Sequence, residues 1–221
     1  MRHRVPHRNE VCHPGTEPPR IRALTMDRMA ATVSSTSGTL ARTRRAILDA
    51  AIEVLAADGS ASLGDIARAA QVGRSTLHRY FADRSALIHA LVRDCAEATL
   101  RAVEEARLED GPVADAFRRL VRAMFDLGYR VNFLFNEVAL SNAEWDEAGW
   151  ERAHVPMVTL FQRGKDEGYF AAEIEPEWFV RSLWYLISAG WEAMAEDDLP
   201  RHVALERVTM TLEGGIRRHD D

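Results

Sequence analysis

Four polar side chains with complementary chemistry stand close together in one short segment of the chain: Arg74, Ser75, His78 and Arg79. On a helix they would share one face, because positions three and four apart are neighbours. Residues 66–82 contain no Asp or Glu, so this face would offer hydrogen bonds and positive charge only. Arginine on such a face can make a bidentate contact to O6 and N7 of guanine in the major groove of DNA. The chemistry indicated is recognition of nucleic acid.

Two short helices separated by a tight break are needed to position this face. Ser62 and Asp65 have the Ser-x-x-acid spacing of a capping box, which predicts that a helix begins there. A break at residues 71–73 separates it from a second short helix, predicted over residues 74–81. Two such helices joined by about three residues that include glycine indicate a helix-turn-helix, whose second helix enters the major groove.

Helical periodicity continues on both sides of this pair, and no strand-like alternation is present. A preceding helix is predicted from about Leu40 to Asp58, closed by Gly59 in the left-handed conformation. Asp83 is placed to cap a following helix that runs to about Glu109. Further helices are predicted around 117–125, over 131–140, 144–167 and 178–194, and from Pro200 to about 214. The sequence therefore predicts an all-α fold of about nine helices, in which a three-helix DNA-binding domain precedes a helical bundle.

Composition excludes several classes of protein. The 221 residues are 47% hydrophobic and 28% charged, as in an ordinary globular chain. No apolar run approaches the ~18 residues of a membrane-spanning helix, and the first thirty residues lack the apolar core of a secretory signal. Cys12 and Cys95 stand apart without metal-ligand spacing. We expect a cytoplasmic protein with free thiols, no membrane association, no metal and no cofactor.

Charge is unevenly distributed along the chain. Residues 1–39 carry a net charge of +3 and residues 40–94 a net charge of +2, whereas residues 95–221 carry 25 acidic against 14 basic side chains. Only the front of the chain is therefore suited to meet a polyanion.

The chain divides into three predicted regions. Residues 1–39 are rich in Pro, Ser and Thr, and predict a disordered leader. Met26 and Met29 lie within this leader as alternatives to Met1 for the true start of the protein. The DNA-binding domain is predicted over residues 40–93 and the second helical domain over residues 94–221.

The segment from Ile66 to Leu87, IARAAQVGRSTLHRYFADRSAL, resembles the signature of TetR-family transcriptional regulators. Residues 43–51 resemble the first helix of that family, and the clear resemblance covers residues 40–93. It implies a sequence-specific regulator, most simply a repressor that a small hydrophobic or aromatic effector releases from a palindromic operator in double-stranded DNA. A constitutive or architectural DNA-binding regulator without an effector pocket is the alternative.

The resemblance also implies roles for individual residues. Arg74 and Ser75 would meet base edges, and Arg79 would meet a base or a phosphate. His78 stands where the family mostly has a phosphate-binding Tyr. Gly64 stands where some members carry a base-reading side chain, so base reading is expected to rest on the second helix of the motif. The predicted DNA contacts, phosphate contacts included, are Thr43, Arg74, Ser75, Thr76, His78, Arg79, Tyr80 and Arg84.

In the second domain the resemblance implies an effector pocket and a homodimer interface on the last two helices. The candidate pocket residues are Phe117, Met124, Phe135, Trp150, His154, Met157, Phe161 and Trp178. Ordinary core packing is the alternative for each of them, because any bundle helix shows an apolar stripe. The candidate dimer contacts are Trp184, Trp191, Val203, Val208, Met210 and Leu212.

An enzyme that uses the acidic second half is the rival class of protein. Its candidate groups are His154 with Glu151, or Glu137 with Asp146 and Glu147. The sequence contains no GxGxxG, P-loop or HExxH motif, and no Ser or Cys nucleophile in a recognisable setting. We therefore expect no catalytic activity.

Overall fold

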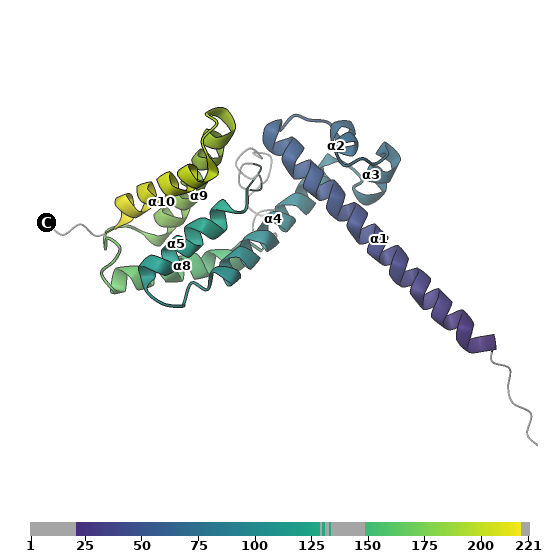
Figure 1. Cartoon of the computed structure of the whole chain (residues 1–221), viewed down its shortest axis with the longest axis horizontal. Helices are drawn as coiled ribbons and strands as arrows, with labels where there is room; N and C mark the ends of the chain where they lie inside the picture. Colours follow the sequence, from purple (N-terminus) through teal and green to yellow (C-terminus); the bar gives the residue numbers. More distant parts are fainter. Residues whose placement is uncertain (1–20, 129, 131–132, 134–148, 218–221) are drawn as a thin grey trace, which may run out of the picture. The chain divides into compact units, whose positions relative to one another are not determined.

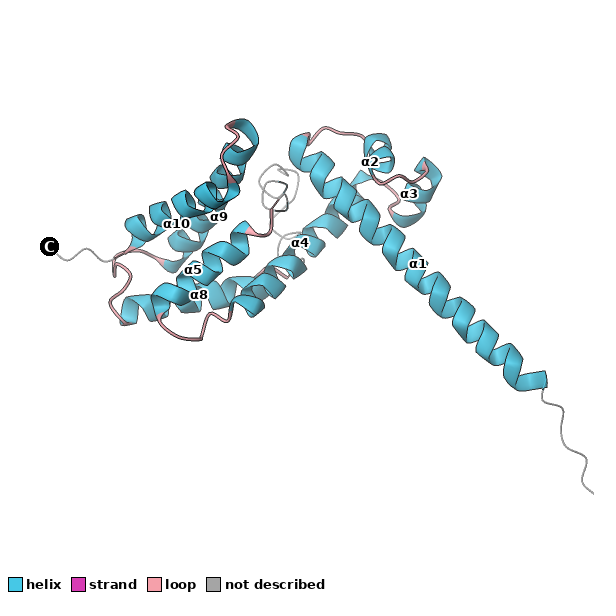
Figure 2. Cartoon of the chain, in the orientation of Figure 1, coloured by secondary structure: helices cyan, strands magenta, loops and turns pink. Residues whose placement is uncertain are grey.

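A computed structural model of the chain describes residues 21–128, 130, 133 and 149–217. Residues 1–43 and 44–221 form two separate units. Throughout the described residues the regular structure is α-helical (Figure 2), which confirms the predicted fold class. The helix predicted over 131–140 lies outside the described residues, apart from Phe133. The helices are α1 (Ile21–Ala57), α2 (Leu63–Ala69), α3 (Arg74–Tyr80), α4 (Arg84–Ala106), α5 (Val113–Phe125), α8 (Glu151–Asp166), α9 (Pro176–Glu196) and α10 (Arg201–Ile216) (Figure 1).

Helix α1 begins at Ile21, well before the predicted start near Leu40. Residues 21–39 are therefore helical where the sequence predicted a leader without regular structure. This stretch contains no proline, so every residue in it can supply the backbone N–H that a helix needs. The predicted domain boundaries at residues 39 and 93 remain predictions.

The end of α1 also differs from the prediction, because Gly59 does not adopt the left-handed conformation. The Asp58 side chain closes the turn instead. Its Oδ1 atom accepts hydrogen bonds from the backbone N of Ser60 at 2.9 Å and from the Ser60 hydroxyl at 2.7 Å. A side chain that completes the turn in this way removes the need for a glycine with positive φ.

A first hydrophobic core, which we call the head core, joins α2, α3, the part of α1 from Arg44 onward and the N-terminal half of α4. Leu77 is the single fully buried side chain of α3, and it anchors that short helix. Phe81 closes the core below it and is 3% exposed. The head core also contains Ile47, Leu48, Ala51, Leu55, Ile66, Ala67, Leu87 and Leu91.

A second core, the body core, is enclosed by α5, α8, α9, α10 and the C-terminal half of α4 (Figure 1). At its centre, the Phe161 ring stacks on the rings of Phe179 and Phe170, with ring centroids 4.6 and 4.8 Å apart. Gly164 lies against this stack, and a Cβ atom on it would come within 2.1 Å of the Phe170 ring. The helices approach closely there because glycine has no side chain.

Helix α4 contributes to both cores. Leu87, Leu91 and Cys95 belong to the head core, whereas Val103 and Ala106 belong to the body core. Its 23 residues correspond to a rod of about 34 Å at 1.5 Å per residue. Among the described residues, none of these helices combines the length and the apolar character that crossing a membrane requires.

Candidate nucleic-acid interface

The pair α2 and α3 is fixed by local hydrogen bonds that the sequence indicated. The Ser62 hydroxyl accepts from the backbone N of Asp65 at 3.2 Å, and the Asp65 carboxylate accepts from the backbone N of Ser62 at 3.1 Å. This capping box confirms the predicted start of α2. The bonds from Ser62, with a smaller contribution from Arg68, lower the pKa of Asp65 and keep it ionised. In the turn, Gln71 takes a φ of 55° and the N–H of Val72 donates to the carbonyl of Ala67 at 2.9 Å.

The outward face of α3 carries the side chains that the sequence singled out. Arg74, Ser75, His78 and Arg79 are exposed, while Thr76 and Tyr80 on the same helix are half-buried. The Nδ1 atom of His78 donates to the carbonyl of Ala82 at 3.2 Å, which leaves Nε2 directed away from this bond. The fold thus brings six of the eight predicted DNA contacts onto one helix of seven residues: Arg74, Ser75, Thr76, His78, Arg79 and Tyr80.

Arg84 has a structural role that the sequence did not reveal. Its guanidinium donates to the carbonyl of Ala61 at 2.6 Å and to the carbonyl of Gly59. The first residue of α4 therefore holds the loop between α1 and α2, with donors of the five-donor guanidinium left over for a phosphate. Asp83 caps the same helix as predicted, since its carboxylate accepts from the backbone N of Ala86 at 2.8 Å. Thr43 belongs to the other unit, where its hydroxyl donates to the carbonyl of Thr39 at 3.0 Å.

A network of four charged residues joins α1 and α4 to Arg130 within the 44–221 unit. Arg45 on α1 donates to both Asp49 and Asp94, with an Nη2 to Oδ2 distance of 3.1 Å to Asp94. Arg130 lies 3.6 Å from Asp94 and 3.7 Å from Asp49. The hydrogen bonds from Arg45 lower the pKa of Asp49. Sequence reasoning missed this network, because Arg45 and Asp94 are 49 positions apart and no local pattern links them.

The predicted effector-pocket residues occupy different environments. Phe117, Met124, Met157 and Phe161 are packed into the body core and are at most 1% exposed. All four belong to the body core. Trp178, by contrast, is 60% exposed on α9. Phe135 lies outside the described residues.

Trp150 links the two cores within the 44–221 unit. Trp150 stands at the start of α8, packs against the head core and meets the Trp184 ring edge-on, with ring centroids 5.9 Å apart. His154 is half-buried one turn further along α8. It lies near Glu151 in sequence, but the other acids of the rival enzyme hypothesis lie outside the described residues. No cluster of three or more His, Cys, Asp or Glu suited to a metal occurs in the part of the chain that the structure describes.

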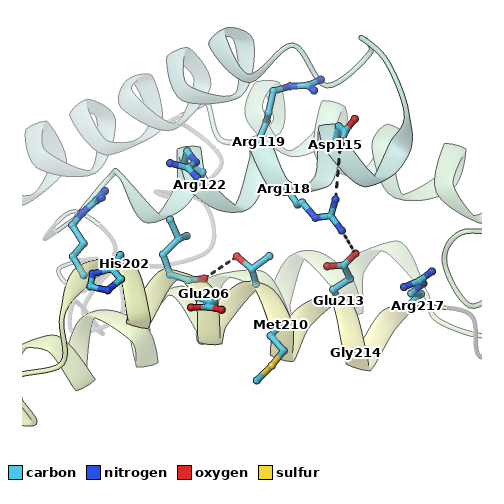
Figure 3. A pocket seen from close by; sticks show the side chains of 13 residues that line it. Asp115, Arg118, Arg119, Arg122, His202, Glu206, Met210, Glu213, Gly214 and Arg217 are labelled. Carbon is cyan, nitrogen blue, oxygen red and sulfur yellow. Dashed lines mark hydrogen bonds and ion pairs between the residues drawn. The ribbon is translucent and has the colours of Figure 1, made fainter.

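A groove of about 1040 Å³ runs between α5 and α10, and it differs from the aromatic pocket that the sequence predicted (Figure 3). Its walls are mostly charged side chains that bond to other parts of the protein. Arg118 lies 2.9 Å from Glu213 and 3.7 Å from Asp115. Arg119 donates to the backbone carbonyl of Ala106 at 2.8 Å. None of the predicted pocket residues lines this groove.

Comparison with known proteins shows to which family the chain belongs. Residues 47–91 match the family described as "Bacterial regulatory proteins, tetR family". The HTH-type transcriptional repressor LfrR of Mycolicibacterium smegmatis is 41% identical over 180 residues, which cover 81% of this chain and 93% of that protein. The chain belongs to the TetR family of bacterial regulatory proteins. It is therefore a DNA-binding regulator of transcription and not an enzyme.

Solved structures agree with this assignment. The TetR-like regulator LfrR from Mycobacterium smegmatis in complex with proflavine has a TM-score of 0.68 and 41% identity, with 79% of this chain and 96% of that chain covered. A TetR-family protein from Vibrio parahaemolyticus has a TM-score of 0.58 at 22% identity, with 80% and 99% covered, and shares the fold. The eight predicted DNA contacts and the pocket residues remain predictions at the level of single residues.

Proposed function

We propose that this TetR-family protein is a homodimeric repressor, acting in the cytoplasm, whose α3 helices bind a pseudo-palindromic operator and release it when a planar aromatic or hydrophobic ligand binds the body. The observation that carries the proposal is the α3 face itself: four exposed polar residues, without an acidic side chain, on a helix held by a single buried anchor. Two such faces in a dimer would read half-sites about one helical turn of DNA, or a multiple of it, apart.

The residues of the head divide into two kinds of DNA contact. Arg74, at the start of α3, and Ser75 read base edges, since the N-terminal residues of a recognition helix reach deepest into the groove. Thr76, Tyr80 and Arg84 contact phosphates and set the position of α3 on the duplex. Arg79 has its guanidinium 5.6 Å from the centre of the Tyr80 ring, which supports a shared role at the edge of the groove.

The last two helices carry the dimer interface in this proposal. Met210 on α10 and Tyr185 on α9 support it, because they are 67% and 60% exposed although both are large and apolar. Two of the residues predicted from sequence have another role, since Val208 and Leu212 are at most 5% exposed and pack into the body core of their own protomer. A two-fold interface would bring the same exposed residues of both copies together.

The proposed effector is a planar aromatic molecule, because the solved structure of the relative LfrR contains proflavine. Helix α4 supports a route from such a ligand to DNA, since it is one rigid element shared by the head core and the body core. Trp150 offers a second contact between the two cores. A ligand that favours one tilt of α4 would change the spacing of the two α3 helices, and linkage then requires ligand and operator to weaken each other by the same factor.

The test starts from the full-length protein and a pool of double-stranded DNA with a randomised centre. Bound fragments are selected and sequenced, and the affinity of the preferred site is measured with and without proflavine. A pseudo-palindromic preference, and an affinity that falls about 5- to 150-fold at saturating proflavine, are the expected results.

Proflavine can also stack between base pairs, so the release needs a control. Binding of proflavine to the protein alone is measured by quenching of tryptophan fluorescence. The same proflavine concentrations are then applied to an unrelated repressor on its own operator, which should stay bound. Binding of proflavine without any change in operator affinity would contradict the proposed switch, and a pool that yields no preferred sequence would contradict operator recognition.

A further inference from the structure

A small hollow of about 260 Å³ lies on the head between the starts of α2 and α3. It owes its existence to Gly64, the second residue of α2. A Cβ atom on Gly64 would lie 3.1 Å from Nη2 of Arg74, 3.2 Å from its Nε and 3.3 Å from its Cζ. The Nε–Nη2 side of the Arg74 guanidinium therefore rests where a side chain on α2 would otherwise stand.

Arg74 lies in this hollow without a polar partner among the described residues. Its guanidinium forms no hydrogen bond or ion pair with any described residue. The two nearest acids in sequence are engaged elsewhere: Asp65 binds Ser62 and Arg68, and Asp83 accepts from the backbone N of Ala86. All five N–H donors of Arg74 remain available for a ligand, while the walls of the hollow restrict the direction in which they point.

We propose that Gly64 is a specificity-determining position, because its missing side chain forms the seat that aims Arg74 at one base pair of each half-site. Discrimination by a bidentate arginine depends on geometry, since both donors must meet O6 and N7 of the same guanine. A methyl group at Gly64 would push the guanidinium aside by a few tenths of an ångström. This inference rests on the proposed function, in which Arg74 reads a base.

The experiment compares base preferences across five full-length proteins, each presented with the same randomised DNA pool. They are the wild type, Gly64→Ala, Arg74→Ala, the double variant, and Gly59→Ala as a control. Gly59 lies in the loop before α2, and a Cβ atom there would have nothing within 4 Å. The control thus adds the same methyl group to the head without touching Arg74, and leaves the Gly59 carbonyl unchanged.

Arg74→Ala should lower the discrimination at one base pair of each half-site about tenfold or more. Gly64→Ala should lower or redirect the preference at that same base pair, about three- to tenfold, and leave the affinity for non-specific DNA unchanged. In the Arg74→Ala background the Gly64 substitution should have no further effect, because its effect passes through the guanidinium. Gly59→Ala should match the wild type.

The outcome shows whether the inference about Gly64 fails alone or together with the proposed base contact of Arg74. If Arg74→Ala flattens a base preference but Gly64→Ala does not, or if Gly64→Ala acts equally with and without Arg74, the inference is wrong and the proposed function stands. If Arg74→Ala changes no preference, Arg74 does not read a base and both are wrong on this point. Circular dichroism checks folding, and Gly64→Ser provides a second addition at the same Cα.

Discussion

The DNA-binding head and the helical body differ in how their side chains are held. In the head, the functional side chains of α3 are exposed, and one buried Leu77 suffices to anchor the helix. In the body, aromatic rings stack tightly enough that Gly164 has no room for a Cβ atom. One added methyl group should therefore change DNA specificity at Gly64 and stability at Gly164. The same chemical change would have different consequences, because one site is built for a partner and the other for packing.

The largest effect is expected from Gly164→Ala in the body. The new Cβ atom would lie 2.1 Å from Phe170 and 3.0 Å from Val113, and the Phe170 ring is itself fixed by stacking. We expect a loss of about 3 kcal/mol in the free energy of unfolding, at the upper end for overpacked cores. Urea denaturation at a fixed protein concentration measures it. Gly215→Ala on α10 is the control, since its Cβ atom meets nothing within 4 Å; a comparable loss there would show that Gly164 is not special.

This contrast also separates what the sequence could predict from what it could not. The start of α2, the cap of α4 by Asp83 and the break before α3 were predictable, because the hydrogen bonds that define them join residues at most a few positions apart. The exposed face of α3 was predictable for the same reason. Its helical spacing and its lack of acidic residues can both be seen within a single short segment of the sequence.

Long-range contacts could not be predicted in this way. The bond from Arg84 to the carbonyl of Ala61 spans 23 positions, and no residue type marks a backbone carbonyl as an acceptor. Phe117 and Phe161 were pocket candidates because an apolar stripe looks the same whether it faces a ligand or a neighbouring helix. The packing of several helices together decides between the two, and the stripe of one helix carries no record of it. In the structure both rings lie against Phe179.

The second prediction concerns how much the charged network around Asp94 contributes to the free energy of unfolding. Asp94 binds Arg45 and lies near Arg130, and its side chain is only 13% exposed. Asp94→Asn should lower the free energy of unfolding by about 2 kcal/mol, because two arginines lose a shared, largely buried carboxylate. Glu97→Gln removes a carboxylate that is 69% exposed and 3.9 Å from its partner, so it should cost at most a few tenths of a kcal/mol. Equal denaturation midpoints for the two variants would show that the network contributes nothing.

The third prediction separates two roles of Arg84, its contact with a DNA phosphate and its hydrogen bonds to the loop before α2. Arg84→Ala should weaken binding to all DNA sequences alike, by about 1 kcal/mol, and lower the slope of log affinity against log salt by about one. Arg84→Lys keeps the charge but cannot imitate the two-carbonyl contact of the guanidinium. Compared with Arg84→Ala, we expect Arg84→Lys to regain the salt slope of the wild type but not its melting temperature. If lysine restores both, the contact with Ala61 and Gly59 does not contribute to stability; if it restores neither, Arg84 does not act as a phosphate contact.

The smallest effect concerns pH and the Asp49 carboxylate. Hydrogen bonds from Arg45 lower its pKa below the ordinary value of 3.8 in the folded protein. A group whose pKa is lowered on folding stabilises the protein above its unfolded pKa, and this contribution is lost as the pH falls through the folded pKa. Wild type should therefore exceed Asp49→Asn in stability by a constant amount above about pH 5, and the difference should shrink as the pH falls below about 4.

Because the Asp49 side chain is 52% exposed, the difference should be only a few tenths of a kcal/mol. Urea denaturation of both proteins at pH 7 and near pH 3 measures it. A difference that stays constant over this range would mean that the ion pair of Asp49 with Arg45 is not what the substitution removes.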